Sequence, residues 1–300
     1  MKILFISSNL IGDSILSTGL LSYLNENNNN VKITLVTGPT ARQLFDNFPN
    51  IENIIVIKKI KFNFHWLILW FKLVGYKWDL IIDLRSSFLS YILFTKKRKI
   101  YLKNNESISQ VEKLSNFMNS NNILMPKIYV NELDKNEAKL IMKDRIAIAI
   151  APGGNWPPKI WPAKNYNKLI FELLNNYSNK NLIFLIVGSL GEEKQYFDKV
   201  VNNVSKEYII NIMGKSLTLT YACLSLCKLF IGNDSGLMHL SAASGINTIG
   251  LFGPTRDDWY RPYGKNCHVI RTKESFNELR NNIKNLKISS MTSISVKDLT

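Results

Sequence analysis

A regular alternation of short apolar runs with longer amphipathic segments begins at the first residues and most constrains what this chain can fold into. The runs are rich in Ile, Leu and Val and have the length of buried strands, whereas the segments between them have the length and periodicity of helices. Strands that alternate with helices in this way are typical of βα units, which build parallel sheets. We therefore predict an α/β protein.

The predicted elements form two similar series separated by a polar stretch, residues 131–144. The first series has expected strands at 3–6, 32–36, 54–57, 80–83 and 99–102 and helices at 14–25, 41–48, 64–74 and 109–118. The second has expected strands at 146–150, 182–187, 209–212, 229–231, 248–252 and 268–270 and helices at 163–177, 192–204, 217–226 and 237–244. A chain of 300 residues fits two domains of about 150 residues each. We predict two doubly wound, Rossmann-like domains, residues 1–144 and 145–300, with a short polar C-terminal tail.

The chain carries a formal charge of +15 at pH 7, which favours anionic partners such as nucleotides or anionic lipid surfaces. Its basic residues are scattered apart from Lys96–Lys99, and no zinc-finger, RRM or KH pattern accompanies them, so nucleic acid is not an expected partner. The three cysteines lack the spacing of a zinc site, and no metal is predicted. Because the sequence shows neither a long apolar run nor a signal-like N-terminus, we expect a cytoplasmic protein.

Residues 62–75 (FNFHWLILWFKLVG) are apolar almost throughout but too short to cross a bilayer. Trp66, Leu69, Trp70 and Leu73 would share one helical face, which favours packing against the rest of the domain. The alternative is peripheral contact with the inner membrane, helped by the neighbouring lysines at positions 58, 59, 61, 72 and 77.

Residues 229–240 (LFIGNDSGLMHL) predict a buried strand that passes through a turn of small residues into a helix. Unpaired backbone N–H groups and the dipole at the start of a helix attract anions. The candidate ligands of a phosphate are therefore Asp234, Ser235, Gly236, Leu237 and His239. The alternative is a helix capped by Asp234 or Ser235, with His239 only packed.

Three further loops follow strands of the second series. In residues 151–162 (APGGNWPPKIWP), Gly153 permits close approach of the backbone and Lys159 supplies a point charge, which favours contact with a diphosphate. Glu192 or Glu193, just past the next strand, suits the ribose hydroxyls, although acidic residues also simply favour a first helical turn. Lys215 follows another strand in a turn that could pack against a base. Thr255, with the adjacent Arg256, ends the strand after the His239 helix and would reach the same anion.

In the first series, residues 9–14 (NLIGDS) follow the first strand and open a helix. Gly12 permits a tight turn, and Asp13 lies at the start of the helix. Asp13 is either an N-cap or a carboxylate that could accept a proton from an alcohol.

Together these segments resemble the heptosyltransferase family of glycosyltransferases (glycosyltransferase family 9), bacterial enzymes that transfer heptose from ADP-heptose to the inner core of lipopolysaccharide. The matching segments, in family order, are 12–13 (GD), 78–85 (WDLIIDLR), 152–153 (PG), 159–162 (KIWP), 233–240 (NDSGLMHL), 242–243 (AA) and 252–255 (FGPT).

The resemblance implies the GT-B architecture, in which two Rossmann-like domains face each other across a cleft. The N-terminal domain would bind the acceptor and the C-terminal domain the nucleotide-sugar. Asp13 would be the catalytic base, with Gly12, Ser14 and Arg85 on the acceptor side. Lys159 would bind the donor phosphates, Asp234 to His239 would form the donor-binding segment, and Glu192 or Glu193 would hold the ribose.

The expected reaction is an inverting transfer that needs no metal, because fixed positive charge can stabilise a departing diphosphate and the sequence has no DxD motif. No cofactor is expected, since the nucleotide-sugar, with ADP-heptose favoured, is a substrate. The expected partners are this donor and a lipid-linked glycan such as lipopolysaccharide core. The alternatives are a transferase of the same family with another nucleotide-sugar or surface-glycan acceptor, and a non-catalytic protein that binds nucleotide-sugars.

Overall fold

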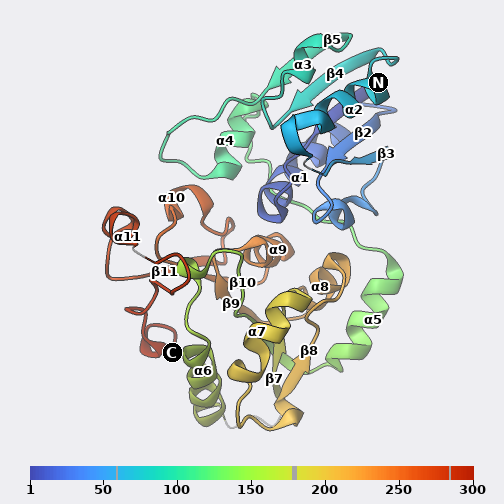
Figure 1. The fold of residues 1–300 in the computed structure, drawn as a ribbon. Helices are drawn as coiled ribbons and strands as arrows, with labels where there is room; N and C mark the ends of the chain where they lie inside the picture. The colour runs from blue at the N-terminus through green and yellow to red at the C-terminus, as the bar shows by residue number, and fades with distance from the viewer. Residues whose placement is uncertain (59, 178–180, 284) are drawn as a thin grey trace. The chain divides into compact units, whose positions relative to one another are not determined.

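A computed structural model describes residues 1–58, 60–177, 181–283 and 285–300. The chain divides into two compact units, Met1–Tyr129 and Val130–Thr300, and each is built around its own sheet (Figure 1). Every pair of neighbouring strands in both sheets is parallel, which confirms the predicted α/β class.

The sheet of the first unit has the strand order β3-β2-β1-β4-β5. Its strands are β1 (Lys2–Ile6), β2 (Lys32–Thr37), β3 (Ile51–Val56), β4 (Trp78–Asp83) and β5 (Thr95–Ile100). Its helices are α1 (Ile11–Glu26), α2 (Phe64–Leu73), α3 (Leu89–Ile92) and α4 (Gln110–Phe117), with 3₁₀ turns η1 (Arg42–Phe45) and η2 (Lys61–Asn63). The order reverses between β1 and β4, where Ile6 is paired with Asp83. The loops after these two strands therefore start side by side at the point where doubly wound sheets bind ligands.

Two predictions for the first unit are wrong. The helix expected at 41–48 is only the 3₁₀ turn η1. The strand expected at 99–102 is β5, which starts at Thr95 and has the sequence TKKRKI. In this edge strand Lys96, Lys97 and Arg98 are exposed, and the strand lacks the apolar run that marks a buried one.

The sheet of the second unit has the order β11-β10-β9-β6-β7-β8. Its strands are β6 (Ile146–Ala151), β7 (Leu182–Ile186), β8 (Ile209–Asn211), β9 (Leu229–Asn233), β10 (Asn247–Phe252) and β11 (Cys267–Arg271). Its helices are α5 (Glu132–Met142), α6 (Ala163–Asn176), α7 (Leu190–Val200), α8 (Leu217–Leu224), α9 (Gly236–Ser244), α10 (Asp257–Tyr260) and α11 (Phe276–Asn282), with 3₁₀ turns η3 (Pro157–Lys159), η4 (Lys206–Tyr208) and η5 (Val296–Asp298). Here the order reverses between β6 and β9, where Ala151 is paired with Gly232.

The polar stretch 131–144 is helix α5 and not a linker. The Asn131 side chain caps it by accepting a hydrogen bond of 2.7 Å from the Asp134 N–H. Ala138 and Met142 are its buried residues, and α5 packs against α8. The compact units consequently divide at residues 129/130, before the predicted boundary at 144/145.

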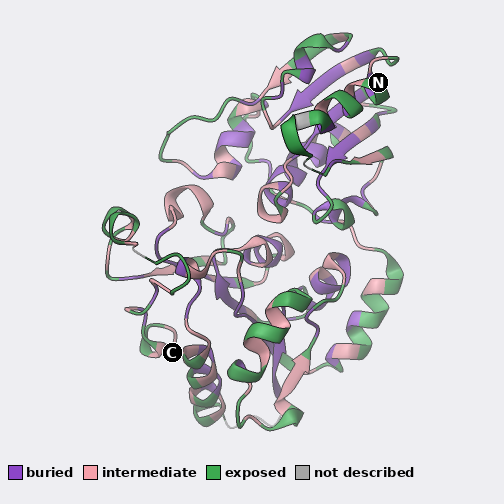
Figure 2. Cartoon of the chain, viewed as in Figure 1, coloured by how far each residue is buried: buried purple, intermediate pink, exposed green. Residues whose placement is uncertain are grey.

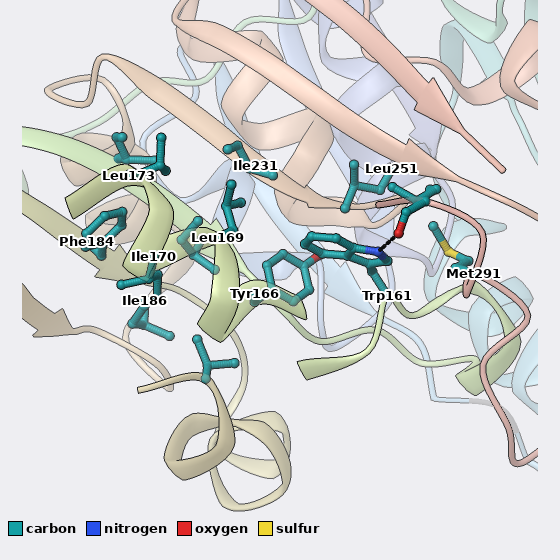
Figure 3. Close-up of a cluster of buried hydrophobic side chains, with 14 of the residues drawn as sticks. Trp161, Tyr166, Leu169, Ile170, Leu173, Phe184, Ile186, Ile231, Leu251 and Met291 are labelled. Carbon is teal, nitrogen blue, oxygen red and sulfur yellow. Dashed lines mark hydrogen bonds between the residues drawn. The ribbon is translucent and has the colours of Figure 1, made fainter. Parts of the chain in front are cut away.

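The core of the second unit gathers around Trp161, which is fully buried (Figure 3). Its indole N–H donates to the backbone oxygen of Ile294 at 3.0 Å, and its ring meets Tyr166 edge-on at 4.8 Å. Met291 and Ile294 are also buried in this cluster. The polar C-terminal tail thus packs into the core and secures the loop that carries Lys159.

Helix α2 packs on the face that its sequence predicted. Leu69 and Leu73 are buried, and Trp66 and Trp70 pack against the same cluster. Other large apolar residues of the helix are exposed, and most of the visible side of α2 is marked as exposed in Figure 2. Lys59, part of the alternative membrane interpretation, lies outside the described residues. None of the described helices is both long enough and apolar enough to cross a membrane.

Candidate functional site

In the second unit, Lys159 and Asp234 meet where the strand order reverses. Asp234 directly follows β9, and its backbone N–H donates to the Leu251 oxygen of β10 at 3.1 Å. The Lys159 ammonium lies 3.5 Å from the Asp234 carboxylate. Their side chains are only 15% and 9% exposed, so solvent screens the pair weakly. The structure therefore brings together two residues that the sequence placed in one site.

Asn233, which the sequence interpretation did not single out, joins the two loops. Its side chain is fully buried, and its side-chain oxygen accepts hydrogen bonds from the backbone N–H of Trp161 (2.8 Å) and the Tyr166 hydroxyl (3.0 Å). Its amide nitrogen donates to the backbone oxygens of Pro152 and Gly153, each at 3.0 Å. An amide can serve as acceptor and donor at once, which explains why Asn rather than Asp ends β9. Its position just before Asp234 was the available signal.

Three buried polar side-chain atoms in the segments that follow β9 and β10 have no hydrogen-bond partner among the described residues. They are the Ser235 hydroxyl, His239 Nδ1 and the Thr255 hydroxyl. Buried polar side-chain atoms are nearly always bonded, so these atoms are candidates to hydrogen-bond a ligand. Ser235 occupies the N-cap position of α9 but its side chain makes no capping bond within the described chain, so the capped-helix alternative is wrong for this residue.

His239 is a neutral side chain in this site. Burial lowers its pKa to about 4, although the nearby Asp234 carboxylate acts in the opposite direction and Lys159 lowers the pKa further. A neutral imidazole can donate one hydrogen bond and accept another. His239 is therefore suited to hydrogen bonding at neutral pH rather than to providing positive charge. Gly236 and Leu237, in the first turn of α9, are partly exposed.

The two acidic candidates of α7 differ in their surroundings. A Cβ on Gly153 would overlap the carboxyl group of Glu192, so glycine allows the Lys159 loop to lie against this side chain. Glu192 also accepts a hydrogen bond of 2.7 Å from the Ser189 N–H as part of a capping box. Glu193 instead accepts a bond of 2.5 Å from the Asn211 amide on β8. Of the two, Glu192 is the one beside the site.

The remaining basic candidates have partners of their own. Lys215 lies 3.9 Å from the Glu137 carboxylate of α5, and both side chains are about half exposed. The Arg256 guanidinium is 4.1 Å from the ring centre of Trp259 and pairs with Asp258. The structure therefore does not join Lys215 to the Lys159–Asp234 pair.

In the first unit, Asp13 lies in the first turn of α1, after β1. The N-cap position is Leu10, so Asp13 is not the N-cap that one interpretation expected. Its carboxylate accepts a hydrogen bond of 3.2 Å from the Ser8 hydroxyl, and the Ser14 hydroxyl donates to the Ser8 backbone oxygen at 3.0 Å. Asp13 and Gly12 are partly exposed, whereas Ser14 is buried.

Arg85 follows β4 and joins this loop through Asn9. Its guanidinium donates to the Asn9 side-chain oxygen at 3.2 Å and lies 4.6 Å from the ring centre of Trp66. Its backbone N–H donates to the buried Asp83 carboxylate at 2.7 Å. Burial lowers the pKa of Arg85, but a guanidinium remains charged at any physiological pH. Asp13 and Arg85 thus belong to neighbouring loops, and the sequence interpretation missed Asn9 and Asp83, which hold Arg85.

The chemistry available in each unit is distinct. The second unit offers a lysine, a helix start and unpartnered hydroxyl and imidazole groups, which suit a phosphate-bearing ligand. The first unit offers the partly exposed Asp13 carboxylate, which suits proton transfer from a hydroxyl. No group of three His, Cys, Asp or Glu side chains within the described ranges could hold a metal ion.

The two parallel-sheet α/β domains match the GT-B architecture of solved heptosyltransferase structures. The chain superposes on Escherichia coli ADP-heptose lps heptosyltransferase II with a TM-score of 0.79, at 21% identity and with 100% of this chain and 96% of that chain covered. It also superposes on the E. coli heptosyltransferase WaaC with ADP, with a TM-score of 0.71, 16% identity and coverage of 100% and 98%.

Sequence comparison identifies the family. Residues 119–288 match glycosyltransferase family 9 (heptosyltransferase), and the chain belongs to this family. It is 29% identical to lipooligosaccharide heptosyltransferase 2 of Campylobacter jejuni over 289 residues, which cover 90% of this chain and 88% of the relative. The predicted resemblance and the predicted enzyme class are confirmed.

Proposed function

We propose that this glycosyltransferase moves heptose from ADP-heptose to an inner-core acceptor of lipopolysaccharide or lipooligosaccharide, with inversion and without a metal. The observation that carries the proposal is the Lys159–Asp234 pair where the second sheet reverses its order, together with the Ser235 hydroxyl and His239 Nδ1, which have no hydrogen-bond partner among the described residues. The relatives named above are heptosyltransferases, and one of the similar structures holds ADP.

The second unit would hold the nucleotide. Lys159, the free N–H groups at the start of α9 and the hydroxyls of Ser235 and Thr255 are all donors for diphosphate oxygens. Neutral His239 adds a hydrogen bond without adding charge. Glu192, beside Gly153, would accept from the ribose hydroxyls, and Lys215 would lie further out, toward the base.

The first unit would hold the acceptor, with Asp13 as the base. Asp13 is partly exposed, and a carboxylate can accept the proton of a bound hydroxyl. Arg85, fixed by Asn9 and Trp66, would orient an anionic group of the acceptor, and Gly12 and Ser14 would shape the same loop.

In the proposed step, the acceptor oxygen attacks the anomeric carbon on the side opposite the diphosphate. The new C–O bond forms as the bond from carbon to the diphosphate oxygen breaks, and this electron pair leaves with ADP. The acceptor proton passes to Asp13. Lys159 and the α9 start stabilise the charge that develops on the diphosphate, as fixed dipoles and cations do in other transferring sites.

We also propose a peripheral location on the cytoplasmic face of the inner membrane, since a lipid-linked acceptor resides there and α2 exposes apolar residues.

A panel of nucleotide-sugar donors tests the proposed transfer reaction. Purified protein is incubated with ADP-heptose, ADP-mannose, UDP-glucose and a heptose-free core acceptor, and products are identified by mass spectrometry. Transfer from ADP-heptose with inverted anomeric configuration supports the proposal. Preference for another nucleotide-sugar supports the same-family alternative, and ADP-heptose binding without transfer to any acceptor supports the non-catalytic alternative.

A further inference from the structure

A groove of about 330 Å³ lies in the first unit between the end of β3 and helix α2. Its walls are mainly apolar and include Ile55 and Ile57 on one side and Ile68 and Leu69 on the other. Leu69 is buried at the base, whereas Ile68 is 49% exposed. A preformed apolar groove of this size can enclose most of a slender apolar ligand.

Two lysines, Lys58 and Lys72, also line the groove and are exposed. Within residues 1–58, 60–177, 181–283 and 285–300, neither ammonium forms an ion pair. Among the described residues that line the groove, none carries a carboxylate. An apolar groove lined by these two lysines, without a carboxylate to pair with them in its described lining, complements a molecule that has a long apolar chain and an anionic head.

The surface next to the groove has the composition of a membrane-contacting helix. Phe64 is 55%, Leu67 49% and Phe71 67% exposed on α2, and Phe62 in the preceding turn is 88% exposed. Large apolar side chains gathered on one helix and flanked by lysines mark an interaction surface, and this combination is typical of helices that lie in a bilayer interface.

We propose that the groove holds one acyl chain of an anionic phospholipid of the membrane, with the lipid phosphate beside Lys58 and Lys72. The chain would lie along Ile55, Ile68 and Leu69, and the exposed residues of α2 would enter the interface around it. The inference rests on the proposed membrane location but on neither the donor nor the catalytic assignments.

The first test uses the full chain and dodecyl phosphate below its micellar concentration, with binding measured by calorimetry. We expect saturable one-to-one binding. Across a series from octyl to dodecyl phosphate, affinity should rise up to about fourfold per methylene, as expected when each methylene leaves water. Dodecyl maltoside, which has an uncharged head, should bind at least tenfold more weakly. The absence of saturable binding, or equal binding of both amphiphiles, would overturn the proposal.

The second test compares two neighbouring substitutions. Ile68→Glu places a carboxylate in the groove, whereas Leu67→Glu places one on the same helix at the same exposure but outside the groove lining. Ile68→Glu should weaken dodecyl phosphate binding at least tenfold, and Leu67→Glu should change it less than twofold. Equal effects of the two variants would show that the groove is not the binding site. Circular dichroism melting checks that both variants fold.

The third test asks whether the acyl chain in the groove comes from a membrane phospholipid. Co-sedimentation with phosphatidylglycerol vesicles should exceed that with phosphatidylcholine vesicles, and the Lys58→Ser, Lys72→Ser double variant should lose this preference. Sedimentation velocity tests whether a second copy of the protein occupies the groove instead. A dimer that dissociates in the Ile68→Glu variant would overturn the proposal. Transfer to a delipidated acceptor is measured in parallel. If Ile68→Glu loses vesicle binding but keeps normal transfer, the result supports the groove as the lipid-binding site. If the wild-type protein binds lipid but shows no transfer, the result refutes only the proposed reaction.

Discussion

The side-chain oxygen of Asn233 accepts a hydrogen bond of 2.8 Å from the backbone N–H of Trp161, and this bond ties the end of β9 to the loop that carries Lys159. The buried Asn233 side chain forms four hydrogen bonds. These bonds fix the position of the Lys159 ammonium relative to Asp234. Asn233 is a positioning residue, because the oxygen and the nitrogen of its side-chain amide both form hydrogen bonds to other protein groups.

Replacing Asn233 with Asp should destabilise the second unit and weaken ADP binding together. The carboxylate would face the Pro152 and Gly153 oxygens without a hydrogen to donate. Unsatisfied buried groups cost about 1–3 kcal/mol each, so we expect a loss of at least about 2 kcal/mol in the free energy of unfolding. Urea unfolding measures this loss, and calorimetry measures ADP affinity. Asn247→Asp, at an exposed asparagine with one bond to Lys228, is the control and should change neither. Normal ADP affinity in a folded Asn233→Asp protein would contradict the positioning role.

Replacing Lys159 with Ala should weaken ADP binding about 10- to 100-fold, the range expected when a charge-assisted hydrogen bond is lost. The folded state should tolerate the change, since Asp234 gains water where the ammonium stood. Calorimetry with ADP measures the effect, which should depend little on salt because Lys159 is largely buried. The matched control is Lys164→Ala, at an exposed lysine of α6. Equal affinities of Lys159→Ala and wild type would remove Lys159 from the donor site.

Replacing Asp13 with Asn should lower the rate of transfer by about 10²- to 10⁴-fold, because general-base catalysis contributes this much. Donor affinity should remain within about twofold of wild type by the same calorimetric assay, since Asp13 belongs to the unit assigned to the acceptor. Asp79→Asn serves as the control, because Asp79 pairs with Lys96 at a surface position. Substantial turnover by Asp13→Asn would disprove its role as base.

The stability of the protein should depend on pH through His239. Its pKa of about 4 in the folded protein lies below the ordinary value of 6.5, so the unfolded chain binds a proton between these values that the folded chain does not. The unfolding free energy should therefore rise with pH from 4 to 6.5 and become level above, with His239 accounting for a loss of about 2 kcal/mol at pH 5 relative to pH 7.5.

Urea unfolding of wild type and His239→Gln at these two pH values isolates this contribution, because Gln does not titrate. The variant should lose about 2 kcal/mol less than wild type when the pH is lowered. Parallel pH profiles of the two proteins would show that His239 is not buried in its neutral form.

Sequence periodicity predicted the two parallel sheets because buried strands in α/β proteins need nearly continuous apolar runs, which stand out from amphipathic helices. The prediction failed where burial is incomplete. Helix α5 buries only Ala138 and Met142, so its sequence looks like a linker, and the edge strand β5 is dominated by lysine and arginine. Neither element has enough apolar surface to be recognised without its neighbours.

For the candidate site, the sequence by itself determined which loops carry the chemistry, because Gly153, Lys159, Asp234 and Asp13 all follow predicted strands. Only the tertiary structure decided how these loops are arranged within each unit. The strand order placed the loops after β6 and β9 side by side, and those after β1 and β4 likewise. It also revealed the Asn233 hydrogen bonds, the contact of Gly153 with Glu192 and the pairing of Lys215 with Glu137. The physical reason is that strand identity follows from local hydrophobicity, whereas hydrogen bonds and charge pairs depend on contacts between residues far apart in the sequence.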